Sequence, residues 1–166
     1  MTKNGFSLIE ILIAIAISLL AAGAAIAGYR NFNTAKIADV AAEEVYSQLV
    51  LIKSKAVSGE KASPSCVNLN YYMIDVVDGE LSYTEFCLDV NGTPDQQGTT
   101  ILDDNGYKDR LFCNSSGTSS NCSFGFRSLS GKTTDDVDHE LFIRYNGCER
   151  KILIEGNGSI SIKACP

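Results

Sequence analysis

The sequence has no tryptophan, a single histidine and only three prolines, the first of them at position 64. Because proline breaks or kinks a helix, its absence leaves the first 63 residues able to form one long helix. With only His139 and no CxxC pair available, a zinc site would need four scattered ligands. Zinc binding is therefore a weak explanation for the six cysteines.

All six cysteines lie beyond residue 65. An even set that is confined to the polar part of a chain is typical of disulfides formed in an oxidising compartment. We therefore expect disulfides rather than six reduced thiols. We also expect the part of the chain that carries them to be exported.

The charge balance is acidic, with 20 acidic and 14 basic side chains and a net charge of −6. A body of this charge repels phosphate backbones unless a local basic patch forms. A nucleic acid is therefore not an expected partner.

Residues 6–29 form a run of 24 positions with one charged residue, Glu10. A helix of this length can cross a hydrocarbon core of about 30 Å. Lys3 precedes the run and mildly favours an amino terminus held in the cytoplasm. The sequence therefore predicts a membrane-spanning helix over residues 6–29.

Three interpretations of this segment compete: a cleaved secretory signal, a plain membrane anchor and a filament helix that is kept after processing. The small residues at 22–24 or 25–27 could serve as a signal-peptidase site. Glu10 weighs against the first interpretation, because a charged acid costs about 3 kcal/mol at the centre of a membrane helix. A generic signal gains nothing from that cost.

Residues 5–10 (GFSLIE), with a short leader before them and a long apolar helix after them, resemble the signature of type IV pilins and pseudopilins. The resemblance implies that a membrane prepilin peptidase cuts between Gly5 and Phe6 and that the new amino group of Phe6 is methylated. A glycine suits this position, because without a Cβ the backbone can lie close to a protease active site. Residues 1–5 would then be a leader that the mature protein lacks.

The same resemblance gives Glu10 a role in assembly, in which the acid pairs with the cationic amino terminus of a neighbouring subunit. An ionisable residue in a membrane segment generally needs such a partner. Two alternatives stay open. Glu10 is four residues from Phe6 and could meet its own amino group, or it could be a tolerated acid that reaches the membrane interface.

The helical period continues past the membrane segment, with apolar residues at three- and four-residue steps from 32 to 56. We expect one continuous helix over residues 6–57, roughly 78 Å long at 1.5 Å per residue. Ser58 and Gly59 provide a stop. The first half would sit in the membrane, and the second would pack its apolar stripe on the exported domain.

Residues 58–166 contain mainly strand and turn signals. Asp78-Gly79 lies between two strand-like runs, and residues 156–158 (GNG) lie between two more near the carboxyl end. Both patterns predict β-hairpins. The expected fold is therefore α+β, with a long amino-terminal helix packed on an antiparallel, β-rich, disulfide-containing domain over residues 58–166.

The cysteine positions suggest a ranked set of bridges. Cys148 and Cys165 lie at nearly matched distances from the second hairpin turn, which favours a bridge between them. Cys113 and Cys122 could close the serine-rich loop between them, which leaves Cys66 with Cys87. Six cysteines allow 15 pairings, so the other connectivities stay open.

A second resemblance is broader. Residues 45–67 and 150–165 are similar to the corresponding regions of GspH/FimT-like minor pilins and pseudopilins, in which a helix leads into β-structure and the last strand follows a glycine turn. Some members of that family bind DNA through an arginine-rich carboxyl end. Here residues 158–163 read GSISIK, without arginine. DNA binding is therefore not implied.

The pattern D-x-N-G-x-x-D occurs twice, fourteen residues apart. Oxygen ligands around a glycine turn suit calcium, although Asn-Gly with flanking Asp is also ordinary turn chemistry. We favour plain turns and keep calcium as the alternative ligand. Its candidate ligands are Asp89, Asn91, Asp95, Asp103, Asn105 and Asp109.

Signals for catalysis are weak. His139 lies between Asp138 and Glu140, but no nucleophile elbow of the type G-x-S-x-G occurs. A surface histidine at the start of a strand is the better interpretation. We therefore expect no enzymatic activity and no cofactor.

The sequence is thus best explained as a structural subunit, most like a minor one, of a type IV pilus or a type II secretion pseudopilus. The resemblance implies a single-pass protein of the bacterial inner membrane that later enters a pilus or periplasmic pseudopilus. It also implies three kinds of partner: other pilin subunits, the prepilin peptidase/methyltransferase and the inner-membrane assembly platform. The alternative is a binding module displayed on a pilus, either an adhesin or a DNA-uptake receptor.

Overall fold

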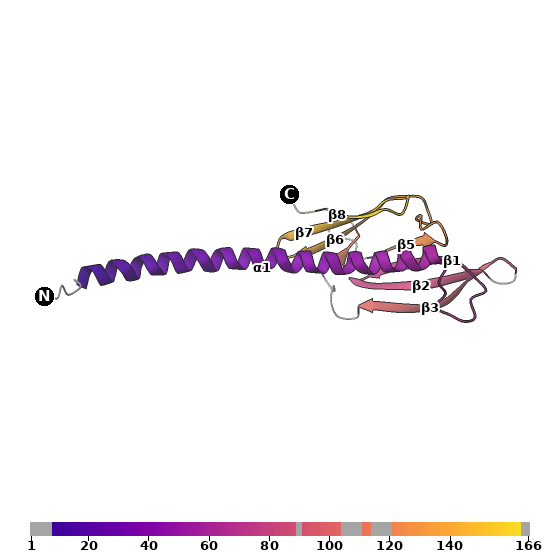
Figure 1. The fold of residues 1–166 in the computed structure, drawn as a ribbon, viewed down its shortest axis with the longest axis horizontal. Coiled ribbons are helices and arrows are strands. Elements are labelled where there is room, and N and C mark those ends of the chain that lie inside the picture. Colours follow the sequence, from indigo (N-terminus) through magenta and orange to yellow (C-terminus); the bar gives the residue numbers. More distant parts are fainter. Residues whose placement is uncertain (1–7, 89–90, 104–110, 114–120, 164–166) are drawn as a thin grey trace.

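The computed structural model describes residues 8–88, 91–103, 111–113 and 121–163. These residues form one long helix and two four-stranded antiparallel sheets (Figure 1). The helix projects far beyond the sheets at its amino-terminal end, and its other half lies along them (Figure 1). The α+β prediction is confirmed.

Helix α1 (Leu8–Ser58) is continuous over 51 residues. Its second half buries a stripe at three- and four-residue steps, as the sequence predicts. The stripe consists of Ala38, Ala42, Val45, Leu49, Ile52 and Ala56. Gly59 ends the helix at a φ of 67°, where the Gly59 N–H donates to Ala56 O (3.1 Å) and the Glu60 N–H to Lys55 O (3.0 Å). This pair of bonds satisfies two of the carbonyls at the end of the helix.

The first sheet has the strand order β3-β2-β1-β5. Its strands are β1 (Asn68–Val77), β2 (Glu80–Leu88), β3 (Pro94–Asp103) and β5 (Cys122–Arg127). Asp78 and Gly79 join β1 to β2, and both have positive φ, at 51° and 79°. Two-residue turns with both central residues in that region match the twist of a hairpin, so the predicted first hairpin forms.

The second sheet has the order β4-β6-β7-β8. Its strands are β4 (Leu111–Phe112), β6 (His139–Tyr145), β7 (Cys148–Ile154) and β8 (Ile160–Lys163). The predicted carboxyl-terminal hairpin pairs β7 with β8. A further turn, Asn146-Gly147, pairs β6 with β7.

The core lies where α1 meets both sheets. The stripe of α1 packs with large buried side chains from each sheet, among them Tyr72, Ile74, Phe124, Phe126, Leu141, Ile143 and Ile152. The aromatic residues of β1 and β2 are packing partners: Tyr71 stacks on Phe86 at 4.7 Å between ring centres, and Tyr72 meets Tyr83 edge-on at 5.6 Å. Cross-strand aromatic pairs of this kind stabilise a sheet.

Two disulfides join described cysteines. Cys66 is bonded to Cys87 and Cys113 to Cys122, with Cα–Cα distances of 5.5 and 5.9 Å. The first bridge is buried and ties the segment after α1 to β2. The third expected pair involves Cys165, which lies outside the described residues.

Replacing both Cys66 and Cys87 by alanine should lower the free energy of unfolding by about 3 kcal/mol, because the bridge closes a loop of 21 residues. Urea unfolding of the full chain in detergent micelles, followed by the near-ultraviolet circular dichroism of the tyrosines, measures this loss. The paired Cys113→Ala and Cys122→Ala variant is the control, with a smaller loss because its loop is shorter. A loss below about 1 kcal/mol for the first pair would contradict the structural role of the bridge.

Candidate assembly surface

The first half of α1 exposes an apolar surface on every side. All side chains from Leu8 to Arg30 are exposed, and this part of the helix extends away from both sheets (Figure 1). In the described part of the chain, α1 is the one helix that is long and apolar enough to cross a membrane. Lipid or other apolar helices must cover such a surface, because water does not solvate it favourably.

Glu10 lies close to the amino-terminal end of this apolar surface. It lines a shallow groove together with Ile11, Ala14, Ile15, Ser18 and Leu19. The sequence has no other charged residue between Leu8 and Arg30. Gly5 and Phe6, the expected cleavage and methylation positions, lie outside the described residues.

An ion pair between Asp39 and Arg150 fixes the second half of α1 on the domain. The Arg150 Nε donates to the Asp39 carboxylate, which joins α1 to β7 across 111 positions of sequence. Only 11% of the Arg150 side chain is exposed. The hydrogen bond from Arg150 lowers the pKa of Asp39 below its usual value and outweighs the opposite effect of burial.

A buried carboxylate fixes the chain where it leaves α1. Glu85, on β2, is 2% exposed and accepts hydrogen bonds from the backbone N–H groups of Ala62 (3.0 Å) and Ser63 (2.9 Å). A buried charge needs such partners. Glu85 holds the segment between α1 and β1 against the first sheet.

Tyr72 supports the same segment from β1. Its hydroxyl donates to the Glu60 carbonyl at 2.6 Å. Burial, with a further contribution from the nearby Glu85 carboxylate, raises the pKa of Tyr72. The hydroxyl therefore stays a donor at neutral pH.

Neither the Glu85 contacts nor the Asp39–Arg150 pair was predicted from the sequence. Glu85 had a signal, because it stands at an inward position of the alternating series Leu81, Tyr83, Glu85 and Cys87. The Asp39–Arg150 pair had none, because its two residues come together only when β7 packs beside α1.

A comparison with known proteins finds a match at the amino-terminal end of the chain. A model described as the prokaryotic N-terminal methylation motif matches residues 1–26. The amino-terminal segment is therefore similar to those of proteins that carry this methylation motif. No curated protein matches the chain.

A solved structure is also similar to this chain: the minor pseudopilin EpsH from the type 2 secretion system of Vibrio cholerae. The two share 14% sequence identity with a TM-score of 0.45, and the match covers 79% of this chain and 97% of that one. The function proposed below therefore rests on the residues of this chain itself.

The expected calcium ligands fall mainly outside the described part of the chain. Asp89, Asn105 and Asp109 lie there, as does the side chain of Asp103. Asn91 and Asp95 are exposed, and the Asp95 carboxylate accepts a hydrogen bond from Gln97 Nε2 at 2.9 Å. Within the described residues, one cluster of possible metal ligands occurs, formed by Cys66, Glu85 and Cys87. Its two cysteines are joined in a disulfide.

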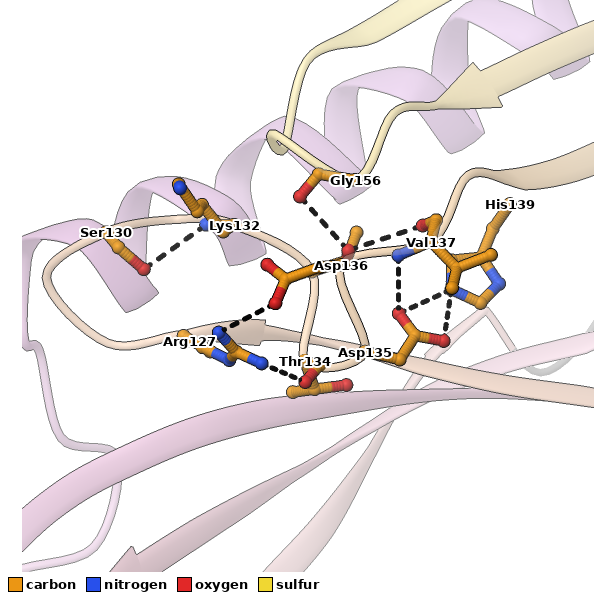
Figure 2. Close-up of polar contacts among 10 residues, drawn as sticks. Arg127, Ser130, Lys132, Thr134, Asp135, Asp136, Val137, His139 and Gly156 are labelled. Atoms are coloured by element: carbon orange, nitrogen blue, oxygen red, sulfur yellow. Dashed lines mark hydrogen bonds and ion pairs between the residues drawn. The ribbon is translucent and has the colours of Figure 1, made fainter.

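The polar residues around His139 form a structural network. The His139 Nε2 lies 3.0 Å from the carboxylate of Asp135 (Figure 2). The His139 ring stacks on Phe124 at 5.0 Å between ring centres. The flanking acids point elsewhere: Asp138 accepts from the Gly156 N–H at 2.7 Å, and Glu140 pairs with Lys151. The three residues of Asp138-His139-Glu140 therefore do not converge on one point.

This network also closes the turn that connects β5 to β6. Arg127 pairs with Asp136 at 3.2 Å and donates to the Thr134 carbonyl (Figure 2). Burial raises the pKa of Asp135, but the hydrogen bonds with His139 and the Val137 N–H together hold that pKa below its usual value. These contacts fix the turn.

Replacing Asp39 by asparagine should lower the free energy of unfolding by about 2 kcal/mol at pH 7, because Arg150 loses its charged partner in a largely buried site. The folded pKa of Asp39 lies below its unfolded value, so its stabilisation is fully present above about pH 4 and fades as pH falls through the folded pKa. Wild type should therefore lose more stability than the variant between neutral pH and pH 2. Urea unfolding at a series of pH values tests this.

The matched control is Glu43→Gln, which removes an exposed acid from the same helix. It should change stability by less than about 0.5 kcal/mol. If Asp39→Asn and Glu43→Gln have the same effect, the ion pair does not anchor α1.

Proposed function

We propose that this pilin-like chain is a structural subunit of a type IV pilus or a type II secretion pseudopilus, cut after Gly5 and assembled through its helix. One observation carries the proposal: an apolar half-helix that contains a single acid extends from a folded, disulfide-bonded domain. Cleavage after Gly5 keeps this half-helix on the mature protein, whereas cleavage near Ala25 would remove it. The exposed apolar surface is therefore part of the mature protein if the chain is cut after Gly5, but not if it is cut near Ala25.

The helix has two successive environments in this proposal. It spans the inner membrane as a single pass, with the domain on the exported side, and it then leaves the lipid to pack against the helices of other subunits. Glu10 makes the membrane state less favourable, because a charged acid in the hydrocarbon core costs free energy, up to about 3 kcal/mol at the centre of the bilayer. A salt bridge to the amino group of a neighbouring Phe6 offsets that cost and favours the assembled state.

Cleavage, membrane insertion and assembly would each require a partner. They are other pilin-like subunits, a prepilin peptidase/methyltransferase and the assembly platform of the inner membrane. The similarity of residues 45–67 and 150–165 to GspH/FimT-like proteins favours a minor component. Glu10 favours a position below the extreme tip, since the tip subunit of secretion systems commonly lacks this acid.

A binding module displayed on a pilus is less well supported. Such a module would need an exposed aromatic or basic patch. Among the described residues, the large aromatic side chains that are highly exposed are Tyr29 and Phe32, and both lie on α1. The large apolar side chains exposed on the domain are aliphatic, such as Leu129 and Val137.

The intact mass and amino-terminal sequence of the native protein test processing. We expect a mature chain that starts at methylated Phe6, with all six cysteines oxidised. Replacing Gly5 by leucine should block cleavage, because a large side chain keeps the backbone away from the protease. A native chain that starts near Ala25 would remove the apolar helix, and the filament proposal would be abandoned.

Replacing Glu10 by alanine tests its role in assembly. The variant should still be processed and inserted, but the fraction of the chain in sheared filaments should fall about ten-fold, the effect of losing roughly 1.4 kcal/mol per subunit contact. Quantitative blotting of the filament and membrane fractions measures the ratio. Ser18→Ala is the control, since it alters the same groove without touching the charge. Equal assembly of both variants would exclude a role for the acid.

A further inference from the structure

Leu129 is the most exposed large apolar side chain in the described part of the chain. It is 78% exposed and lies on the turn between β5 and β6. Its φ of 63° places its backbone in the left-handed region, which a large side chain adopts only at a cost in free energy. The chain therefore tolerates two unfavourable features at one residue. Strain of this kind is common where a side chain is held for contact with another molecule.

Hydrogen bonds to two other elements fix the backbone that carries Leu129. The Leu129 N–H donates to Ala56 O, near the end of α1, at 3.0 Å. The Ser128 N–H donates to Asn70 O, on β1, at 2.9 Å. The conformation of the turn is therefore set by the fold of the domain, and Leu129 does not depend on a partner to reach it.

Gly131 packs the other side of the same turn against α1. Gly131 is buried at a φ of 64°, and a Cβ at this position would lie 2.6 Å from a methyl carbon of Val57. Its N–H donates to Arg127 O at 3.0 Å. The turn has no room to move toward the helix, so the exposed Leu129 side chain is held in a fixed place. A side chain that is already ordered loses little entropy when it binds.

The turn lies at the end of the domain that is remote from the membrane segment. Between Tyr29, at the end of the apolar run, and Ala56, which contacts Leu129, the helix rises roughly 40 Å. The carboxyl-terminal end of α1 and the projecting amino-terminal half lie at opposite ends of the molecule (Figure 1). The membrane that holds the apolar half therefore does not cover Leu129.

Charges of both signs lie beside the turn. Lys132 lines a polar hollow together with three acids, Asp136, Asp138 and Glu155. An anionic lipid surface would attract the lysine but would be repelled by the acids. An apolar residue within a polar rim is instead typical of a contact between proteins. The partner that fits is a protein surface with an apolar pocket for one leucine and a polar rim.

We propose that Leu129 enters an apolar pocket on a different pilin-like subunit, which lies beyond the end of the domain that faces away from the membrane. The inference rests on the proposed function, which makes this chain a minor subunit below the tip and so gives it a neighbour on that side. Two copies of this chain cannot meet through Leu129 of both, because such a contact would point their helices in opposite directions. Subunits that leave the same membrane have parallel helices.

Replacing Leu129 by asparagine separates a role in binding from a role in folding. Asparagine adopts the left-handed region more readily than leucine, and it removes the apolar side chain. The urea midpoint of the full-length variant in detergent micelles should therefore match that of wild type to within about 0.3 M, or exceed it. A larger fall would show that Leu129 stabilises the domain itself, and the inference would be wrong.

Binding is measured by fluorescence anisotropy against each of the other proteins of the same cell that carry the methylation motif, purified full-length in micelles. One of them should bind the wild-type chain, and L129N should bind it at least about ten-fold more weakly, because burial of a leucine favours association. The control V77N removes another exposed aliphatic side chain, at the opposite end of the first sheet, and should bind like wild type. Equal binding of wild type and L129N, or binding to none of these proteins, would overturn the proposal.

A photo-reactive residue at Ser130 tests the contact in assembled filaments. Ser130 is exposed and follows Leu129 directly. Irradiation of filaments from cells that naturally make the chain should link this position to the same protein that binds in micelles, and mass spectrometry identifies the linked peptide. No link, links only to copies of this chain, or links to an exported protein outside the filament would contradict a different subunit as the partner.

The two proposals can fail separately. If the processed wild-type chain is absent from every filament fraction, the structural-subunit function is wrong. If the wild-type chain is present in filaments and L129N binds as wild type does, the function stands and the role of Leu129 is wrong.

Discussion

The apolar half of α1 cannot remain in water, and the rest of the structure depends on this constraint. Every side chain from Leu8 to Arg30 is exposed, so the folded domain offers this segment no cover. Two environments can supply it: the hydrocarbon core of a membrane and a bundle of similar helices. A subunit that exchanges one for the other would use the same residues twice.

The second half of α1 connects the apolar half of the helix to the domain, and its contacts with the domain are spread along its length. A stripe of small and branched residues packs against both sheets, and the Asp39–Arg150 pair joins α1 to β7. The end of the helix is secured by the Gly59 turn, by Glu85 and by the Cys66–Cys87 bridge. Polar contacts and a disulfide thus add to the attachment that side-chain packing provides.

The sequence alone determined the elements whose signals are local. Three such elements are the apolar helix over residues 6–29, the Asp78-Gly79 turn and the helix stop at Gly59. Each could be predicted from residues close together in the sequence, because the rules for helices and hairpins act over short stretches of chain. The methylation motif over residues 1–26 is local as well. Tertiary structure decided the division of the strands into two sheets and the meeting of Asp39 with Arg150. These depend on contacts between distant residues, and no local pattern encodes which surfaces meet when the chain packs.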